Sequence, residues 1–202
     1  MSIKLTNVEH STFNMGGAEA EENRLPRDEG RIIELARTAV EAYVLSGHIV
    51  EPPPFPETSP LGKPSACFVS IKMAGHELRG CIGTVEPDHA TLAEEIIANA
   101  IKAATRDPRF YPVSGDELPS LLYSVDVLGS LELARFEDLN PSAFGVVVTD
   151  QSGSRRGLLL PDIESIETAD QQVGVAARKA GIKPGEPLRL YRFRTRRFGE
   201  SA

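Results

Sequence analysis

Residues 78–84 read Leu-Arg-Gly-Cys-Ile-Gly-Thr, and this stretch combines more special residue types than any other part of the chain. It carries one of only two cysteines, Cys81, with glycines close on both sides and Arg79 two positions before it. Residues 67–73, Cys-Phe-Val-Ser-Ile-Lys-Met, alternate apolar and mixed positions, and Ala-Gly-His follows as a turn signal. Two such runs around a short turn predict a β-hairpin.

The hairpin predicts different surroundings for the two cysteines. Successive strand side chains point to opposite faces of a sheet. Cys67 therefore shares an apolar face with Val69 and Ile71, whereas Cys81 shares the other face with Arg79. Because their side chains point to opposite faces, we expect no disulfide between them.

A two-residue turn at residues 74–75 fixes the expected register of this hairpin. It sets Ile71 opposite Leu78 and Lys72 opposite Glu77, which pairs apolar with apolar and cation with anion. In this register Leu78 lies on the apolar face.

Cys81 is the candidate reactive thiol. Arg79 lies about 7 Å away along the same face, at ~3.3 Å of rise per residue. A fixed guanidinium favours thiolate and lowers the pKa below the free value of about 8.5. Gly80 and Gly83 would let a substrate approach the backbone N–H groups closely. The alternative is a structural cysteine beside glycines that mark only a bulge.

Length and composition predict a globular protein, either one domain with a tail or two small lobes that share a core. The 202 residues are 41% hydrophobic and 25% charged, and the net charge of −7 gives no overall attraction to nucleic acid or to an anionic membrane. With no signal peptide and no long apolar run, we expect the cytoplasm. We interpret residues 1–27 as a flexible extension and residues 28–202 as the domain.

Helix and strand signals follow one another along this domain. The stretch Thr-Leu-Ala-Glu at 91–94 is a capping box, and glycines at 47 and 181 mark helix ends. A proline-rich segment, 48–64, should be an extended connector. The remaining predicted elements are helices at 29–45, 91–106 and 169–180 and strands at 121–128, 144–149, 156–160 and 188–197.

Two basic features have both a structural and a functional interpretation. Asp107-Pro108-Arg109 forms a rigid corner, either as a local salt bridge or to present Arg109 to an anionic ligand. Arginines alternate along the last strand at Arg192, Arg194 and Arg196. Charges on an edge strand discourage sheet-to-sheet pairing, so we predict this structural role rather than nucleic-acid binding.

No obvious base or metal site accompanies Cys81. The four histidines are scattered without ligand spacing, although carboxylate metal sites stay open. His76 should lie at the hairpin tip, and His89 could fold back towards Cys81 without being compelled to.

Three motifs in their order and spacing carry a resemblance. They are residues 78–84, the Asp-Pro-Arg-Phe corner at 107–110 and Gly-Leu-Leu-Leu-Pro at 157–161. With them the chain resembles the AMMECR domain family over about residues 30–198. Many prokaryotic relatives carry a second cysteine where this chain has Ala177, so the resemblance does not support a two-cysteine mechanism here.

The resemblance implies an α+β fold with an antiparallel sheet, flanking helices and two unequal lobes, and residues 79–84 near the groove between them. It further implies the A component of an AmmeMemoRadiSam system, whose partners are a Memo-like protein and a radical SAM protein. Two functions stay open: a cysteine-dependent enzyme or enzyme component, and a non-catalytic adaptor for those partners. The candidate site residues are Cys81 and Arg79 for catalysis, and Gly80, Gly83, Thr84, Asp107 and Arg109 for binding.

Overall fold

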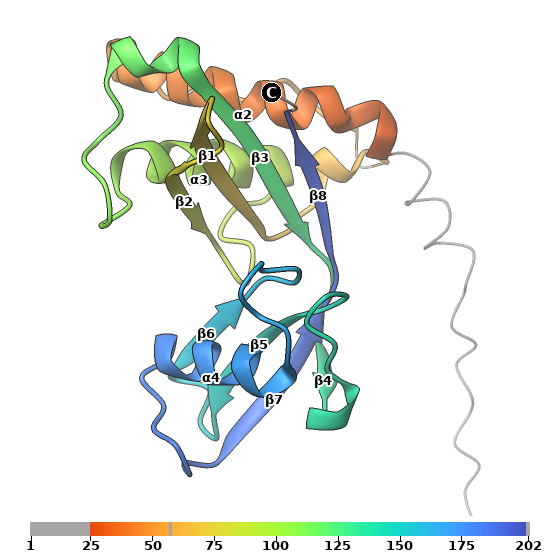
Figure 1. Cartoon of the computed structure of the whole chain (residues 1–202). Coiled ribbons are helices and arrows are strands. Elements are labelled where there is room, and N and C mark those ends of the chain that lie inside the picture. Colours follow the sequence, from red (N-terminus) through yellow and green to blue (C-terminus); the bar gives the residue numbers. More distant parts are fainter. Residues whose placement is uncertain (1–24, 57, 201–202) are drawn as a thin grey trace, which may run out of the picture.

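The computed structural model describes residues 25–56 and 58–200. Most of the predicted extension at 1–27 therefore lies outside the described residues, and residues 25–27 belong to the first helix. The fold is α+β, as predicted, with two four-stranded antiparallel sheets that form two lobes (Figure 1).

The first lobe holds the sheet β2-β1-β3-β8, whose strands are β1 (Cys67–Met73), β2 (Leu78–Gly83), β3 (Leu121–Leu128) and β8 (Thr195–Gly199). Helices α2 (Leu25–Ser46) and α3 (Leu92–Thr105) cover one face of this sheet (Figure 1). Two short 3-10 helices, Pro60–Gly62 and Gly115–Ser120, lie in its connections.

The second lobe is smaller and holds the sheet β4-β7-β5-β6. Its strands are β4 (Glu132–Ala134), β5 (Gly145–Asp150), β6 (Arg156–Leu159) and β7 (Leu188–Phe193). Helix α4 (Ala169–Lys179) packs on β5 and β6. A 3-10 turn at Phe136–Asp138 follows β4.

The helix ends follow the capping residues. Thr91 accepts from the N–H of Glu94, whose carboxylate accepts from Thr91 in return, so the predicted capping box opens α3. Gly47 and Gly181, with φ of 71° and 67°, follow α2 and α4 in the left-handed conformation that glycine adopts without strain. These three predicted boundaries are confirmed within a few residues.

A small apolar cluster joins the lobes. Phe68 from the first lobe packs against Leu158 and Phe193 from the second, around the buried Val147. Leu128, at the end of β3, belongs to the same cluster. Because buried apolar contacts are closely packed, this junction fixes the two sheets relative to each other.

The hairpin register differs from the prediction. The turn has three residues, since Met73 N–H donates to Glu77 O, so Lys72 pairs with Leu78. A bulge then leaves Arg79 unpaired, and Ser70 pairs with Cys81. The predicted pairs of Ile71 with Leu78 and of Lys72 with Glu77 are wrong, and Leu78 is 38% exposed instead of lying on the apolar face. Beyond the bulge the shift is two residues, which keeps Cys81 on its predicted face.

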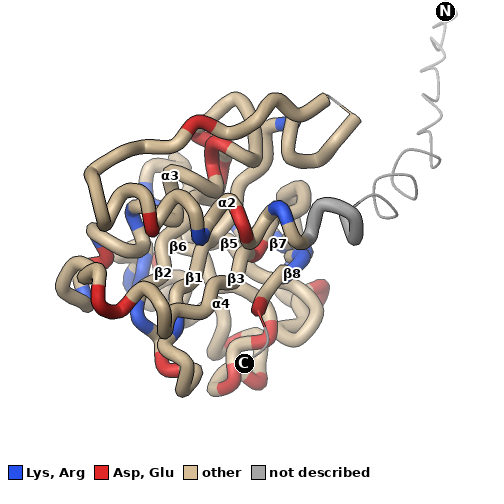
Figure 2. Tube along the Cα trace, turned by 90° about the horizontal axis from the view of Figure 1, so that it is seen from above, with Lys and Arg blue, Asp and Glu red and all other residues tan. Residues whose placement is uncertain are grey.

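The predicted last strand is two strands in different sheets. The chain leaves β7 at Phe193, and Arg194 lies between β7 and β8, where the chain passes from one lobe to the other (Figure 1). Arg192 and Arg194 both stack on the ring of Phe144, at 4.6 and 4.5 Å from its centroid. In Figure 2, acidic and basic residues are interspersed around the described part of the chain.

Residues 25–56 and 58–200 contain no candidate for a membrane-spanning helix. Every helix there is too short or too polar to cross a bilayer.

Candidate functional site

Cys81 lies on β2 with its side chain on the sheet face away from α3. Its neighbour Gly80 faces the helix so closely that a Cβ there would meet the carbonyl oxygen of Ala103 at 2.2 Å. Alternation then turns Cys81 to the opposite face. There the hydroxyl of Ser70 donates to the Cys81 sulfur at 3.2 Å. The thiol is partly buried.

The Asp107-Pro108-Arg109 corner binds the open edge of β2. The N–H of Cys81 donates to Asp107 Oδ2 at 2.8 Å. Arg109 donates twice to the same carboxylate, at 2.9 and 2.7 Å. Asp107 is only 5% exposed. The local salt bridge of the structural interpretation is present, and the presentation of Arg109 to an anionic ligand stays a prediction.

These contacts set the charge of Asp107. The hydrogen bonds from Arg109, with those from backbone N–H groups, hold the pKa of Asp107 well below its usual range against the opposing effect of burial. The corner therefore presents a fixed carboxylate–guanidinium pair beside the thiol.

Arg79 has a different place from the one predicted. Its guanidinium binds Glu117 at 2.6 and 3.0 Å and the carbonyl of Tyr111 at 3.0 Å. The hydrogen bond from Arg79 lowers the pKa of Glu117 to about 2. Arg109 is the arginine whose charge lowers the pKa of Cys81 most, and Arg197 also interacts with this thiol. The bulge explains the difference, because it takes Arg79 out of the alternation.

The expected low pKa of Cys81 is also corrected. Burial raises the pKa of the Cys81 thiol, and the hydrogen bond from Ser70 and the charge of Arg109 oppose this only in part. Burial raises the pKa of Cys67 to about 12. Both cysteines are therefore thiols at rest, and Cys81 is the less buried of the two, with Ser70 and Arg109 favouring its thiolate.

Gly80, Gly83 and Thr84 have structural reasons to be present. A Cβ at Gly83 would meet the ring of Phe68 at 2.3 Å, so both glycines are needed for packing. Thr84 donates to the buried carboxylate of Glu95 at 2.5 Å. The other oxygen of Glu95 accepts from two backbone N–H groups of the following loop. These residues hold the hairpin and its loop on α3, and a ligand role for them stays a prediction.

Neither histidine considered as a base lies beside Cys81. His89 lines a cavity of about 500 Å³ with Tyr43 and Ile97, on the outer side of α2 and α3. His76 lies in the hairpin turn with φ of 65°.

Three charged residues near the thiol were not among the predicted site residues. Asp126 on β3 binds Arg197 on β8 at 2.8 Å, and both lie on the sheet face of Cys81. Lys179, at the end of α4, donates to the carbonyl of Leu158 at 3.2 Å and interacts electrostatically with Cys81. Strand alternation would have found Asp126 once the order of the strands was known. No sequence signal connects Lys179 with Cys81.

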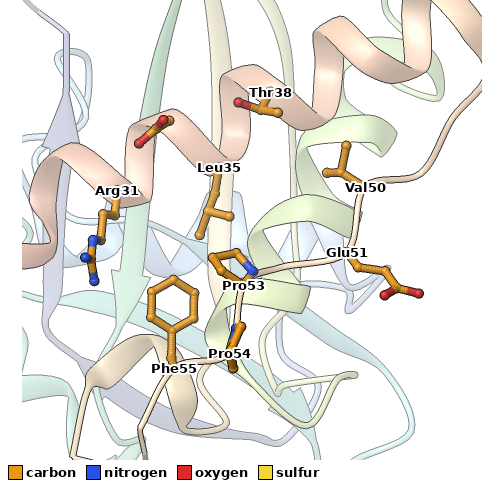
Figure 3. Close-up of a pocket in the computed structure, with 9 residues that line it drawn as sticks. Arg31, Leu35, Thr38, Val50, Glu51, Pro53, Pro54 and Phe55 are labelled. Atoms are coloured by element: carbon orange, nitrogen blue, oxygen red, sulfur yellow. The ribbon is translucent and has the colours of Figure 1, made fainter.

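Residues 25–56 and 58–200 hold no group of three or more His, Cys, Asp or Glu side chains arranged for a metal ion. A cavity of about 340 Å³ lies between α2 and the proline-rich segment, where Arg31 stacks on Phe55 at 5.9 Å (Figure 3). Its walls are distinct from the surroundings of Cys81.

Comparison with known proteins decides the family. The AMMECR1 family model matches residues 33–198, which includes the hairpin, the corner and the lobe junction. The chain belongs to the AMMECR1 family. An uncharacterized protein of Pyrococcus horikoshii has the same fold in its crystal structure, with a TM-score of 0.75, 31% identity and coverage of 84% of this chain and 90% of that one.

Relatives in this family come from bacteria and archaea. A protein of Thermotoga maritima is 41% identical over 82% of this chain and 95% of its own length, and one of Thermofilum pendens is 36% identical over 88% and 92%. A protein of Clostridium acetobutylicum is 42% identical over 84% of this chain, but the match spans only 36% of that protein. The AMMECR1 region is there part of a longer protein.

Proposed function

We propose that this AMMECR1-family protein is a cysteine-dependent enzyme, or an enzyme component, with Cys81 as its nucleophile. The observation that carries the proposal is the pairing around this residue: a hydroxyl donor 3.2 Å from the sulfur and a carboxylate 2.8 Å from the main-chain nitrogen. One contact holds the sulfur and the other holds the main chain of Cys81, so the thiol is kept in one position, as a nucleophile requires.

The electrostatics suit a thiol that reacts only with a bound substrate. Burial keeps Cys81 protonated, while Ser70 and Arg109 favour the thiolate. A substrate that brings an electrophilic carbon to the sulfur gains a new C–S bond, the thiol proton passes to solvent, and the leaving group departs with its electron pair.

The proposal includes partner proteins, a Memo-like protein and a radical SAM protein. Two observations support partners in general. Tyr111 is 90% exposed directly after the Asp107–Arg109 corner, and its carbonyl is bound by Arg79. In the Clostridium relative the matched region is joined to other sequence in one chain. An exposed aromatic residue beside a rigid corner is a suitable anchor for an interface.

The test is a metabolite pulldown that compares the wild-type protein with Cys81→Ser. Retention of a small molecule by the wild type and its loss in Cys81→Ser is the expected result. Cys67→Ala is the matched control and should retain the molecule, because Cys67 lies on the other face of the hairpin. Equal retention by wild type and Cys81→Ser would contradict the proposal.

An adaptor without catalysis is the second candidate, favoured by the same burial that raises the pKa of Cys81. It predicts that Tyr111→Ala loses the partner proteins in a copurification experiment, while Cys81→Ser binds them as the wild type does and retains the same metabolites. The enzyme proposal predicts that Cys81→Ser changes the bound metabolites.

A further inference from the structure

The lobe junction brings a lysine of the second lobe towards the thiol of the first. Lys179 Nζ donates to the carbonyl of Leu158 at 3.2 Å, and Leu158 packs in the inter-lobe cluster with Phe68. Phe68 lies on the same face of β1 as Ser70, two residues away, and Ser70 contacts the sulfur of Cys81. The charges of Cys81 and Arg109 both act on Lys179.

The three cations around Cys81 differ in their hydrogen-bond partners. Arg109 is matched by the carboxylate of Asp107 and Arg197 by that of Asp126, each through two hydrogen bonds. Lys179 instead donates to a neutral carbonyl. Among these three cations Lys179 is the one whose side-chain hydrogen bond goes to no carboxylate, while Asp162 acts electrostatically on Arg197 in addition to Asp126.

A positive charge in a partly desolvated junction favours an anion that lies between the lobes. Coulomb interactions there are stronger than in bulk water, because the neighbouring protein screens less than solvent does. Partial burial lowers the pKa of Lys179 because it removes water from the charged ammonium. A bound anion would offset this loss of hydration by pairing with the ammonium.

We propose that Lys179 is the anion-binding arm of the Cys81 site, and that the site takes a small electrophile carrying a carboxylate or phosphate group. This inference rests on the proposed function, in which Cys81 is the nucleophile. It adds that the second lobe supplies part of the site, so that the substrate is held at the junction of the lobes.

A structural role for Lys179 must be separated from this one. Lys179 and Arg178 are both basic residues in the last turn of α4, where cations stabilise the helix dipole. Arg178→Met removes the same favourable charge from the same turn, so it is the matched control for Lys179→Met.

The experiment compares alkylation of Cys81 by iodoacetate, which is an anion, and by iodoacetamide, which is neutral and otherwise similar. In both reactions the sulfur forms a bond to carbon, the C–I bond breaks, iodide leaves with the electron pair and the thiol proton passes to solvent. Mass spectrometry gives the rate at Cys81, and the ratio of the iodoacetate rate to the iodoacetamide rate measures the preference for an anion.

We expect this ratio to be higher in the native protein than in a cysteine peptide. Lys179→Met should lower it about five-fold, the change that corresponds to ~1 kcal/mol for one charge at about 4 Å in water. Lys179→Arg should keep most of the preference, and Arg178→Met should leave it unchanged.

The failures are distinguishable. Labelling of Cys81 by both reagents with the same ratio in wild type and Lys179→Met overturns the inference and leaves the nucleophile in place. An equal fall of the rate ratio in Arg178→Met and Lys179→Met also overturns the inference, because the helix dipole would then explain the preference for the anion. Failure of both reagents to label Cys81 overturns the proposed function together with the inference.

Discussion

At the scale of single residues, Asp107 does the most to hold the site. Its buried carboxylate accepts from the N–H of Cys81 and from the guanidinium of Arg109. The N–H of Cys81 points out of the sheet edge, where water would otherwise be its partner. The carboxylate of Asp107 thus holds the edge of β2, the 107–109 corner and the Arg109 guanidinium together.

Asp107→Asn should lower the free energy of unfolding at pH 7 by about 2 kcal/mol, because it removes charge-assisted hydrogen bonds from a buried position. Urea unfolding measures this. The exposed Asp116→Asn is the control and should change stability by no more than about 0.5 kcal/mol.

The pH dependence of this effect follows from the pKa of Asp107, which is lower in the folded protein than in the unfolded chain. The stabilisation is therefore present above the unfolded value of about 3.9 and is lost as the pH falls towards the lower folded value. The wild type and Asp107→Asn should converge in stability below about pH 4. A difference that stays constant from pH 7 to pH 2 would contradict this explanation.

Residue types alone predicted that the two cysteines lie on opposite faces of the hairpin, and they predicted the wrong arginine beside Cys81. Cys67 and Cys81 differ by strand alternation, which needs only the local sequence. Arg79 is drawn away from Cys81 by a bulge and by its contact with Glu117, which is distant in sequence. No local pattern contains either feature. The role of Lys179 depends on how two lobes pack, so it was outside the reach of sequence patterns.

At the scale of elements, close contact between β2 and α3 sets the position of the candidate site. Gly80 lies against the backbone of Ala103, and this contact turns Cys81 to the free face. The helix itself was predictable from its capping box. The bulge beside Gly80 was not predictable from the sequence. It follows from the length of the turn, and that length depends on His76 adopting a positive φ.

Gly80→Ala should destabilise the protein by about 2–3 kcal/mol, because its Cβ would meet the Ala103 carbonyl and the helix must move. Chemical denaturation measures the change. Gly75→Ala is the control, since a Cβ in that turn meets nothing within 4 Å, and it should cost no more than about 0.5 kcal/mol. Similar losses in both variants would mean that backbone freedom, rather than contact with α3, determines the need for glycine.

At the scale of the whole molecule, the two lobes share one junction and chain crossings at 129–131 and at Arg194. The α+β class was predicted through the resemblance to the AMMECR family. The division of the predicted last strand between two sheets was not predictable, because the alternation continues through the crossing. The partners of each half, β4 and β5 for β7 and β3 for β8, lie far away in sequence.

The apolar junction, rather than the ion pair between the lobes, should hold the molecule together. Phe193 is almost fully buried in the inter-lobe cluster, so Phe193→Ala should cost about 3–5 kcal/mol. Glu86 and Arg156 form an ion pair across the junction at 2.8 Å but are partly exposed, and Glu86→Gln should cost less than about 1 kcal/mol. Thermal unfolding that ranks these variants in the opposite order would contradict this account of the junction.

The most direct test of the central claim is mass-spectrometric mapping of iodoacetamide labelling in the native protein at neutral pH. Cys81 is partly accessible and has Ser70 and Arg109 to stabilise its thiolate, whereas burial raises the pKa of Cys67 to about 12. Cys81 should be labelled well before Cys67, and its labelling should be slower in Arg109→Ala than in Arg79→Ala. Equal labelling of the two cysteines, or faster labelling of Cys67, would contradict the central claim.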